Sequence, residues 1–211
     1  MINHIDVLVH SSIRIRTESG SIYIDPFHMV EETHDAAFIL ITHDHFDHFS
    51  PEDIRKAARE DTVMVVPENM KKKAREATDL VAETVTVAPG NSYTVKGLSL
   101  ETIPAYNILK PFHPKSAGWV GYILNLDGKR IYIAGDTDIT EENKKVSCDI
   151  ALVPVGGTYT MDAKKAAKLV NLIRPEIAVP MHYGDIVGDP KDAEIFKKNV
   201  DPAIKVAIRM A

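Results

Sequence analysis

Apolar and polar residues alternate at the start of the chain with a period of two, the pattern of half-buried strands. The alternation runs through residues 5–9, 13–15 and 22–24. It predicts a meander of short strands. Residues 36–41 then form a continuous apolar run, which is typical of a strand covered on both faces.

Helix signals follow this run. Ser50 offers a capping hydroxyl and Pro51 suits the first helical position, so we expect a helix that runs to about residue 60. A β-branched run over residues 62–66 predicts another strand. Residues 68–77 predict a basic helix, and we interpret its charges as a solvated helix face rather than a phosphate-binding patch.

The second half of the chain repeats this plan. Strands are predicted over residues 84–88, 93–96, 98–103, 119–126, 130–134, 150–155, 177–181 and 204–208, and helices over 160–173, capped by Thr160, and 192–199. Asp127-Gly128 predicts a tight hairpin turn. Each half begins with a meander and passes into buried strands that alternate with helices. No linker separates the halves, so we expect one α/β domain over residues 1–211, with two packed sheets covered by helices.

Composition and charge narrow the classes of function. The chain has 211 residues, of which 45% are hydrophobic and 26% charged, the balance of a globular protein. Its 25 basic and 30 acidic residues give a net charge of -5, which makes nucleic acid an unfavourable partner. No apolar run approaches the roughly 20 residues needed to span a bilayer. The single cysteine, Cys148, and the lack of a signal-peptide pattern favour a cytoplasmic location.

A cluster of potential metal ligands follows the apolar run at residues 36–41. Residues 42–48 read THDHFDH, and the potential ligands are His43, His45, Asp47 and His48. Imidazole and carboxylate are the donors that divalent ions such as zinc prefer. So short a loop suits two adjacent ions better than one tetrahedral ion. Asp136 and His182 follow two further predicted strands, and we expect them to be ligands as well.

Together these motifs resemble the metallo-β-lactamase-fold hydrolases, in particular small single-domain members such as the ascorbate-6-phosphate lactonase-like group. The segments that carry the resemblance are His10-Ser11-Ser12, Asp25-Pro26-Phe27, residues 42–48, Gly135-Asp136-Thr137, residues 156–162 and Met181-His182-Tyr183-Gly184. The resemblance covers nearly the whole chain. It implies a four-layer αββα sandwich with the metal ions at one edge between the sheets.

The resemblance also implies a set of ligands for two divalent ions. They are His43 and His45 for the first ion, Asp47, His48 and His182 for the second, and Asp136 as a bridge. The family usually supplies a further first-site histidine at the position of Asn107. Because an amide oxygen is a poorer and harder ligand than imidazole, the first site would bind weakly or favour manganese over zinc. Alternatively, His113 folds back to complete this site.

Other residues are candidates to support the site. Asp25 would accept a hydrogen bond from a ligand imidazole and so fix its tautomer. His10 lies near the site by resemblance, or is a structural histidine at a strand end. In the irregular segment 106–119, Tyr106, His113 and Lys115 are candidates to hold an anionic substrate, and the alternative is an ordinary packed loop.

We therefore expect a hydrolase that uses a metal-activated water on an ester, lactone, amide or phosphodiester bond of a small, anionic substrate. Asp47 and Asp136 would orient the attacking hydroxide. The competing hypothesis, motivated by Asn107, is a metal-binding scaffold or sensor with weak or no catalysis. Cys148 lies away from the Asp136 motif, which argues against the lactamases that use a cysteine ligand. Assembly into a homo-oligomer stays open.

Overall fold

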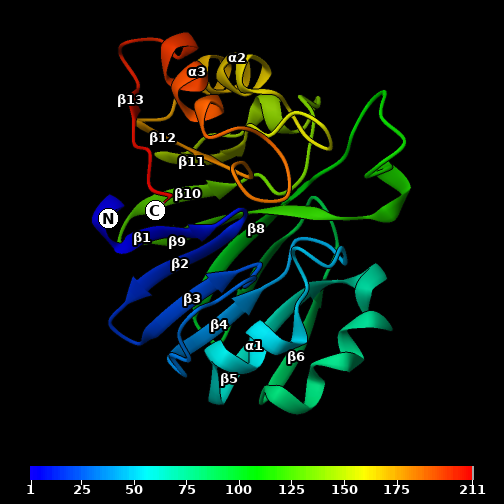
Figure 1. Cartoon of the computed structure of the whole chain (residues 1–211). Coiled ribbons are helices and arrows are strands. Elements are labelled where there is room, and N and C mark those ends of the chain that lie inside the picture. The colour runs from blue at the N-terminus through cyan, green and yellow to red at the C-terminus, as the bar shows by residue number, and fades with distance from the viewer. Residues whose placement is uncertain (211) are drawn as a thin grey trace. The chain divides into compact units, whose positions relative to one another are not determined.

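The computed structural model describes residues 1–210 and divides them into two compact units. The first unit comprises Met1–Ala88 together with Met210, and the second comprises Pro89–Arg209. Each unit contains one mixed β-sheet and its own helices (Figure 1). Within residues 1–210, no helix is both long and apolar enough to cross a membrane.

The sheet of the first unit begins as a meander and continues as parallel strands. In spatial order its strands are β1 (Ile5–Val9), β2 (Ser12–Thr17), β3 (Gly20–Ile24), β4 (Ala36–Leu40), β5 (Ala58–Pro67) and β6 (Glu83–Val87). Strands β1 to β3 pair antiparallel, and β3 to β6 pair parallel. All five residues of β4 are buried, as its continuous apolar sequence predicts.

Helix α1 (Pro51–Ala57) begins where the sequence predicts but ends before residue 60. The Ser50 hydroxyl accepts a 3.3 Å hydrogen bond from the Asp53 amide, which caps the first turn. Directly after the helix, Ala58 opens β5 and pairs with Ala36 of β4. Pairing with the sheet therefore ends the helix earlier than its local pattern predicts.

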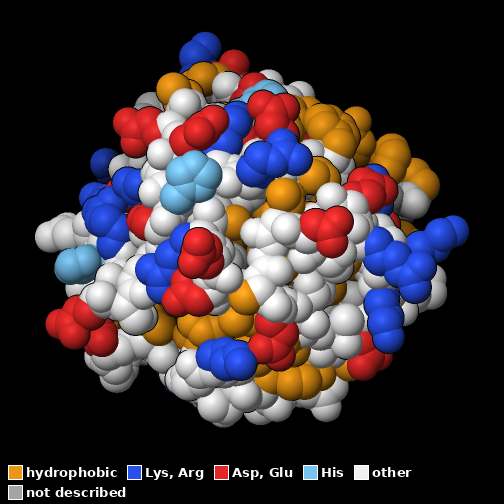
Figure 2. Space-filling view, turned by 90° about the horizontal axis from the view of Figure 1, so that it is seen from below, with side chains coloured by type: hydrophobic (Ala, Val, Ile, Leu, Met, Phe, Trp, Pro, Cys, Tyr) orange, Lys and Arg blue, Asp and Glu red, His pale blue; other side chains and the backbone are white. Residues whose placement is uncertain are grey.

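The segment 68–77, predicted as one basic helix, forms separate 3-10 turns. The short helices of this unit are η1 (Ile2–His4), η2 (Glu68–Met70), η3 (Lys73–Glu76) and η4 (Thr78–Leu80). Met70, Ala74 and Ala77 reach the core, so the segment has a buried face although it winds more tightly than the predicted helix. Lys73 pairs with Glu76 at 2.8 Å, and Figure 2 shows basic and acidic side chains interspersed over the face seen from below.

The second sheet follows the same plan as the first. Its strands are β7 (Ser92–Val95), β8 (Leu98–Pro104), β9 (Val120–Leu126), β10 (Lys129–Ile133), β11 (Ile150–Pro154), β12 (Ile177–Met181) and β13 (Lys205–Val206). Strands β7 to β10 pair antiparallel, and β10 to β13 pair parallel. The repeat predicted from the sequence is confirmed, although the strand predicted at residues 204–208 keeps only two residues.

Two α-helices pack against each other in the second unit, at the top of Figure 1. The helices of this unit are α2 (Ala163–Ile173), α3 (Lys191–Asn199), η5 (Lys115–Ala117) and η6 (Asn143–Lys145). The predicted cap Thr160 is wrong, because Asp162 accepts a 2.8 Å hydrogen bond from the Lys165 amide and caps α2. Gly156 forms a β-bridge with Asp162, so the helix begins only after this residue.

Within each sheet, the carboxyl ends of several strands lie along one side of that sheet. In the first unit β1, β3 and β4 run in the same direction, and in the second unit β8, β10, β11 and β12 do. The residues that follow these strands include His10, Asp25, segment 42–48, Asn107, Asp136 and His182. Each sheet thus delivers its share of the predicted site residues to a single edge.

Candidate metal centre

The loop after β4 folds into a tight turn that carries the histidine motif. The amides of His48 and Phe49 donate to the His45 carbonyl at 3.0 and 2.8 Å, which closes this turn. Side chains of His43 and His48 are buried, whereas Phe46 is 69% exposed. The turn therefore directs the potential ligands inward and the intervening phenylalanine outward.

The donor atoms of this loop have the spacing of ligands around an ion. Nε2 of His43 lies 3.1 Å from Nδ1 of His45, and Nε2 of His48 lies 3.5 Å from Oδ2 of Asp47. Neighbouring ligand atoms around a tetrahedral zinc ion, with bonds of 2.0–2.1 Å, would be about 3.3 Å apart. Charge-assisted hydrogen bonds are shorter, about 2.7–2.9 Å. The donor set and its spacing fit a divalent metal ion.

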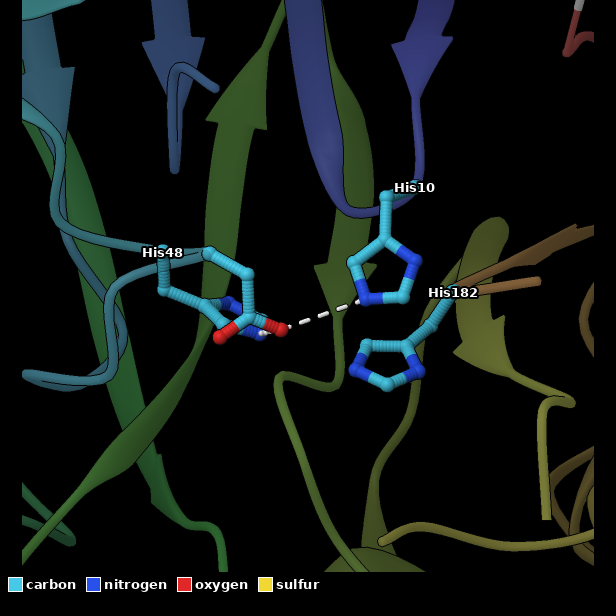
Figure 3. Close-up of side chains that lie close together, drawn as sticks. His10, His48 and His182 are labelled. Atoms are coloured by element: carbon cyan, nitrogen blue, oxygen red, sulfur yellow. Dashed lines mark ion pairs between the residues drawn. The ribbon is translucent and has the colours of Figure 1, made fainter. Parts of the chain in front are cut away.

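His10 joins these donors from the turn after β1. Its Nε2 lies 3.3 Å from Oδ2 of Asp47, the ion pair that the dashed line marks in Figure 3. The donor atoms of His10, Asp47 and His48 all lie within 4.8 Å of one another. The structure therefore places His10 among the potential ligands, whereas the sequence suggested a supporting role. We call His10, His43, His45, Asp47 and His48 the histidine cluster.

Asp25 organises two histidines of this cluster. Nδ1 of His48 donates a 2.7 Å hydrogen bond to Oδ2 of Asp25. The Thr42 hydroxyl donates to the same oxygen at 2.6 Å and lies 2.9 Å from Nδ1 of His43. Because the single hydroxyl proton goes to the carboxylate, Thr42 can only accept from Nδ1–H of His43. Both Nε2 atoms are thereby left with a lone pair for a metal ion.

The Asp25 carboxyl is fully enclosed by this network. Burial raises its pKa, while the contact with His48 and the donors from Thr42 act in the opposite direction. The Thr42 amide supplies a further donor at 2.7 Å. The sequence identified Asp25 but missed Thr42, whose only signal is its position directly before His43.

A second cluster, which we call the Asp136 cluster, consists of His113, Asp136 and His182 in the second unit. Oδ2 of Asp136 lies 3.2 Å from Nε2 of His113 and 3.1 Å from Nε2 of His182. All three side chains are buried. Each imidazole nitrogen thus lies at the spacing of neighbouring metal ligands from the same carboxylate oxygen.

Asn107 supports this cluster through its amide nitrogen. Nδ2 donates to the carbonyls of Phe112 and Tyr159 at 2.9 and 2.7 Å, and it lies 3.2 Å from Nδ1 of His113. Oδ1 is buried without a hydrogen-bond partner. The amide is therefore fixed with its oxygen available, while His113 is held with Nε2 beside Asp136.

Four predicted site residues adopt left-handed backbone conformations. The positive φ angles are 52° for His10, 48° for Asp25, 58° for His113 and 60° for His182. Such conformations are unfavourable for residues other than glycine, by about 1–3 kcal/mol each, and they concentrate at functional sites. The strain lies at the residues that present their side chains at the edges of the sheets.

Two of the three candidate substrate-binding residues, Tyr106 and Lys115, are engaged within the protein. Nζ of Lys115 lies 2.7 Å from Oε1 of Glu142 and 4.8 Å from the centre of the Tyr106 ring. The Tyr106 hydroxyl donates to Oε2 of Glu142 at 2.7 Å. These two donors, Lys115 first, lower the pKa of Glu142 to about 2. The positive charge of Lys115 is therefore balanced by the Glu142 carboxylate, which stays ionised at neutral pH.

Cys148 has the properties of an inert thiol. It is half-buried, and burial raises the pKa of its thiol to about 12. Because metal ligation requires the thiolate, this protonated side chain is a poor ligand.

The chain is similar over most of its length to proteins of one family. Residues 4–182 match the family model described as a β-lactamase superfamily domain. A UPF0173 metal-dependent hydrolase of Pyrococcus abyssi is 33% identical over 203 residues, covering 90% of this chain and 89% of the relative. One from Thermococcus kodakarensis is 34% identical over 202 residues, with the same coverages of 90% and 89%.

Solved structures agree with these similarities. A metal-dependent hydrolase from Parabacteroides distasonis superimposes with a TM-score of 0.81 and 34% identity, covering 97% of this chain and 91% of that one. The metallo-hydrolase Igni18 from Ignicoccus hospitalis gives a TM-score of 0.75 at 24% identity, over 97% and 93% of the two chains.

Proposed function

Because the chain belongs to the UPF0173 metal-dependent hydrolases of the β-lactamase superfamily, we propose that it hydrolyses an ester, lactone or phosphodiester bond. The predicted family and the predicted metallo-β-lactamase fold class are confirmed. The protein is a metal-dependent hydrolase. The bond type and the substrate are our inference.

The observation that carries the proposal is the donor spacing in the two clusters. Contacts of 3.1–3.5 Å join nitrogen and oxygen donors in the histidine cluster and in the Asp136 cluster. Borderline divalent ions prefer this mixture of imidazole and carboxylate, so zinc is our first choice and manganese the alternative. We propose two ions, as the number of donors suggests.

The ligands proposed are those that the sequence resemblance implies, with one change. They are His43, His45, Asp47, His48, Asp136 and His182. For the remaining donor, the contact between Nε2 of His113 and Asp136 favours His113, because imidazole is a better ligand for zinc than an amide oxygen. His10 is a further potential donor because of its contact with Asp47.

Bound divalent ions would supply an activated water and polarise the bond to be cleaved. The carboxylates of Asp47 and Asp136 can accept hydrogen bonds from this water and orient it. Asp25 and Thr42 hold His48 and His43 with their Nδ1 atoms protonated. The chain's own residues thus fix the direction of the donors before any substrate binds.

We propose a small substrate whose binding does not depend on the two lysines of segment 106–119. Lys115 is paired with Glu142, and Lys110 lies 3.1 Å from Asp138. Both cations of the loop therefore already have a carboxylate partner.

Metal analysis combined with a panel of chromogenic substrates tests the proposal. We expect close to two zinc or manganese ions per chain and turnover of at least one phosphodiester, ester or lactone. His48→Ala and Asp136→Ala should each lose bound metal and lower kcat/KM by at least about 100-fold. His4→Ala, an exposed histidine outside both clusters, is the matched control.

Two outcomes contradict the proposal. One is full activity of the metal-free protein. The other is one tightly bound ion without turnover of any substrate class, which would support the metal-binding scaffold instead.

A further inference from the structure

A short stretch of the loop between β8 and β9 exposes an unusual amount of apolar surface. Ile108, Leu109 and Phe112 are 59%, 94% and 44% exposed. Nine large hydrophobic side chains are exposed among residues 1–210, and these three fall within five consecutive positions. Contiguous exposed apolar groups mark binding surfaces more often than isolated ones do. We call residues 108–112 the apolar segment.

The apolar segment is anchored at both ends to buried residues. The Asn107 amide donates to the His113 carbonyl at 2.8 Å, and Nδ2 of Asn107 donates to the Phe112 carbonyl at 2.9 Å. These hydrogen bonds hold the two ends of the segment side by side, so the segment forms a closed loop.

The closed end of this loop lies at the Asp136 cluster. His113 directly follows Phe112, and its Nε2 lies 3.2 Å from Oδ2 of Asp136. Consecutive Cα atoms are about 3.8 Å apart, so the apolar segment ends one residue before a proposed ligand. A substrate bound beside Asp136 therefore has this segment as a neighbouring surface.

Phe112 is also held in a fixed orientation. Its ring meets the Tyr159 ring edge to face, with centroids 4.8 Å apart and an interplanar angle of 87°. The Tyr159 carbonyl is fastened by Asn107 at 2.7 Å. The aromatic surface is therefore ordered before a ligand binds, which lowers the entropic cost of binding.

The charges of the same loop are neutralised within the protein. Nζ of Lys110 lies 3.1 Å from Oδ1 of Asp138 and donates to the Thr160 carbonyl. Lys115 is paired with Glu142 at 2.7 Å. The loop thus exposes apolar side chains while its cations already have partners, which favours an apolar ligand over an anionic one.

We infer that the apolar segment binds the acyl chain of an ester or lactone substrate, with the carbonyl directed to the Asp136 cluster. The inference rests on the proposed function and specifies its substrate class. Apolar contact with Leu109 and Phe112 would then multiply kcat/KM by a roughly constant factor for each methylene of the acyl chain.

A series of p-nitrophenyl esters from acetate to octanoate tests the substrate class with the metal-loaded enzyme. We expect kcat/KM to rise about two- to fourfold for each added methylene until the segment is covered. Leu109→Ser and Phe112→Ser should flatten this dependence. Leu172→Ser changes a side chain of α2 that is 52% exposed, and it should leave the dependence as it is.

A binding experiment separates this inference from the proposed function. Trp119 is the single tryptophan, and its ring lies 5.3 Å from the His113 ring, so its fluorescence reports on this loop. Straight-chain alkyl hydroxamates should bind more tightly as they lengthen, and the dependence should disappear in Leu109→Ser and Phe112→Ser. This result without ester or lactone turnover would support the segment and contradict the reaction. Length-independent binding, or equal slopes in all variants, would overturn the inference.

Discussion

Asp25 and His48 are joined by a 2.7 Å hydrogen bond between a buried carboxylate and the ring Nδ1. The opposite nitrogen of the same ring lies 3.5 Å from Asp47. Nδ1 of the imidazole therefore makes a hydrogen bond, whereas Nε2 has the longer spacing of a metal ligand. This division of roles leads to the first two predictions.

Asp25→Asn should weaken metal binding by about 10- to 100-fold. The asparagine keeps the shape, but its amide hydrogens oppose the donors from His48 and Thr42. Competition with a chromogenic chelator measures the affinity. Asp35→Asn is the matched control, since Asp35 accepts hydrogen bonds from Ser21 and Tyr23 at the other end of β4. Equal metal affinity of Asp25→Asn and the wild-type protein would contradict the assigned role.

Thr42→Val should also weaken metal binding, by about tenfold, because it removes the acceptor of Nδ1–H of His43. Valine preserves the volume of the side chain. Thr42→Ser retains the hydroxyl and should bind metal nearly as the wild-type protein does. Long-range ¹H–¹⁵N spectra give a second readout, in which Nδ1 of His43 is protonated in the wild-type and Thr42→Ser proteins. Equal metal affinities of the Thr42→Val and Thr42→Ser variants would exclude this role of the hydroxyl.

Asn107→Asp tests whether Asn107 holds the loop through its Nδ2 hydrogen bonds or binds a metal ion through Oδ1. If Asn107 bound a metal ion through Oδ1, the carboxylate would bind it more tightly. The structure leads to the opposite expectation, because a carboxylate oxygen would face the carbonyls of Phe112 and Tyr159 in place of Nδ2. We expect weaker metal binding and a loss of about 2–3 kcal/mol in unfolding free energy, measured in urea. Tighter metal binding would identify Asn107 as a ligand after all.

Glu142→Gln should change how stability depends on pH. The donors Lys115 and Tyr106 lower the pKa of Glu142 to about 2, below the ordinary glutamate value of about 4.3. The contribution of the ionised Glu142 to the unfolding free energy is therefore present above about pH 4.5, and it is lost as the pH falls towards 2. At pH 7 the contribution should stay below about 1 kcal/mol, since Lys115 is largely exposed.

Urea unfolding at pH 7, 4 and 2.5, with chelator present, measures this difference. The gap between the wild-type protein and Glu142→Gln should close across this range. A gap of constant size would show that the ion pair does not form in solution.

Local pattern predicted the sheets well because burial sets it directly. The apolar run that became β4 and the two meanders with their parallel continuations appear where the period of the sequence placed them. The pattern failed where tertiary contacts compete with local preference. Ala58 pairs with Ala36 and ends α1 early, and the bridge from Gly156 to Asp162 moves the cap of α2 from Thr160 to Asp162.

The candidate site shows the same division. The spacing of segment 42–48 and the positions of Asp136 and His182 after strands predicted metal chemistry, since ligand identity and strand ends are properties of the sequence. The contact of His113 with Asp136 depends on how the loop folds back, and no spacing rule contains that information. The same holds for the carboxylate partners of Lys110 and Lys115, which lie 28 and 27 positions away.

By itself, the sequence determined the fold class, the repeated sheets and the kinds of ligand, because hydrophobic period and donor chemistry are local properties. Tertiary structure decided which nitrogen of His43 and of His48 is available, and that Thr42 links Asp25 to His43. It also decided that the loop after β8 exposes apolar side chains while its lysines have carboxylate partners. These features depend on contacts between residues far apart in the chain. Such contacts exist only once the loops are closed at the edges of the sheets.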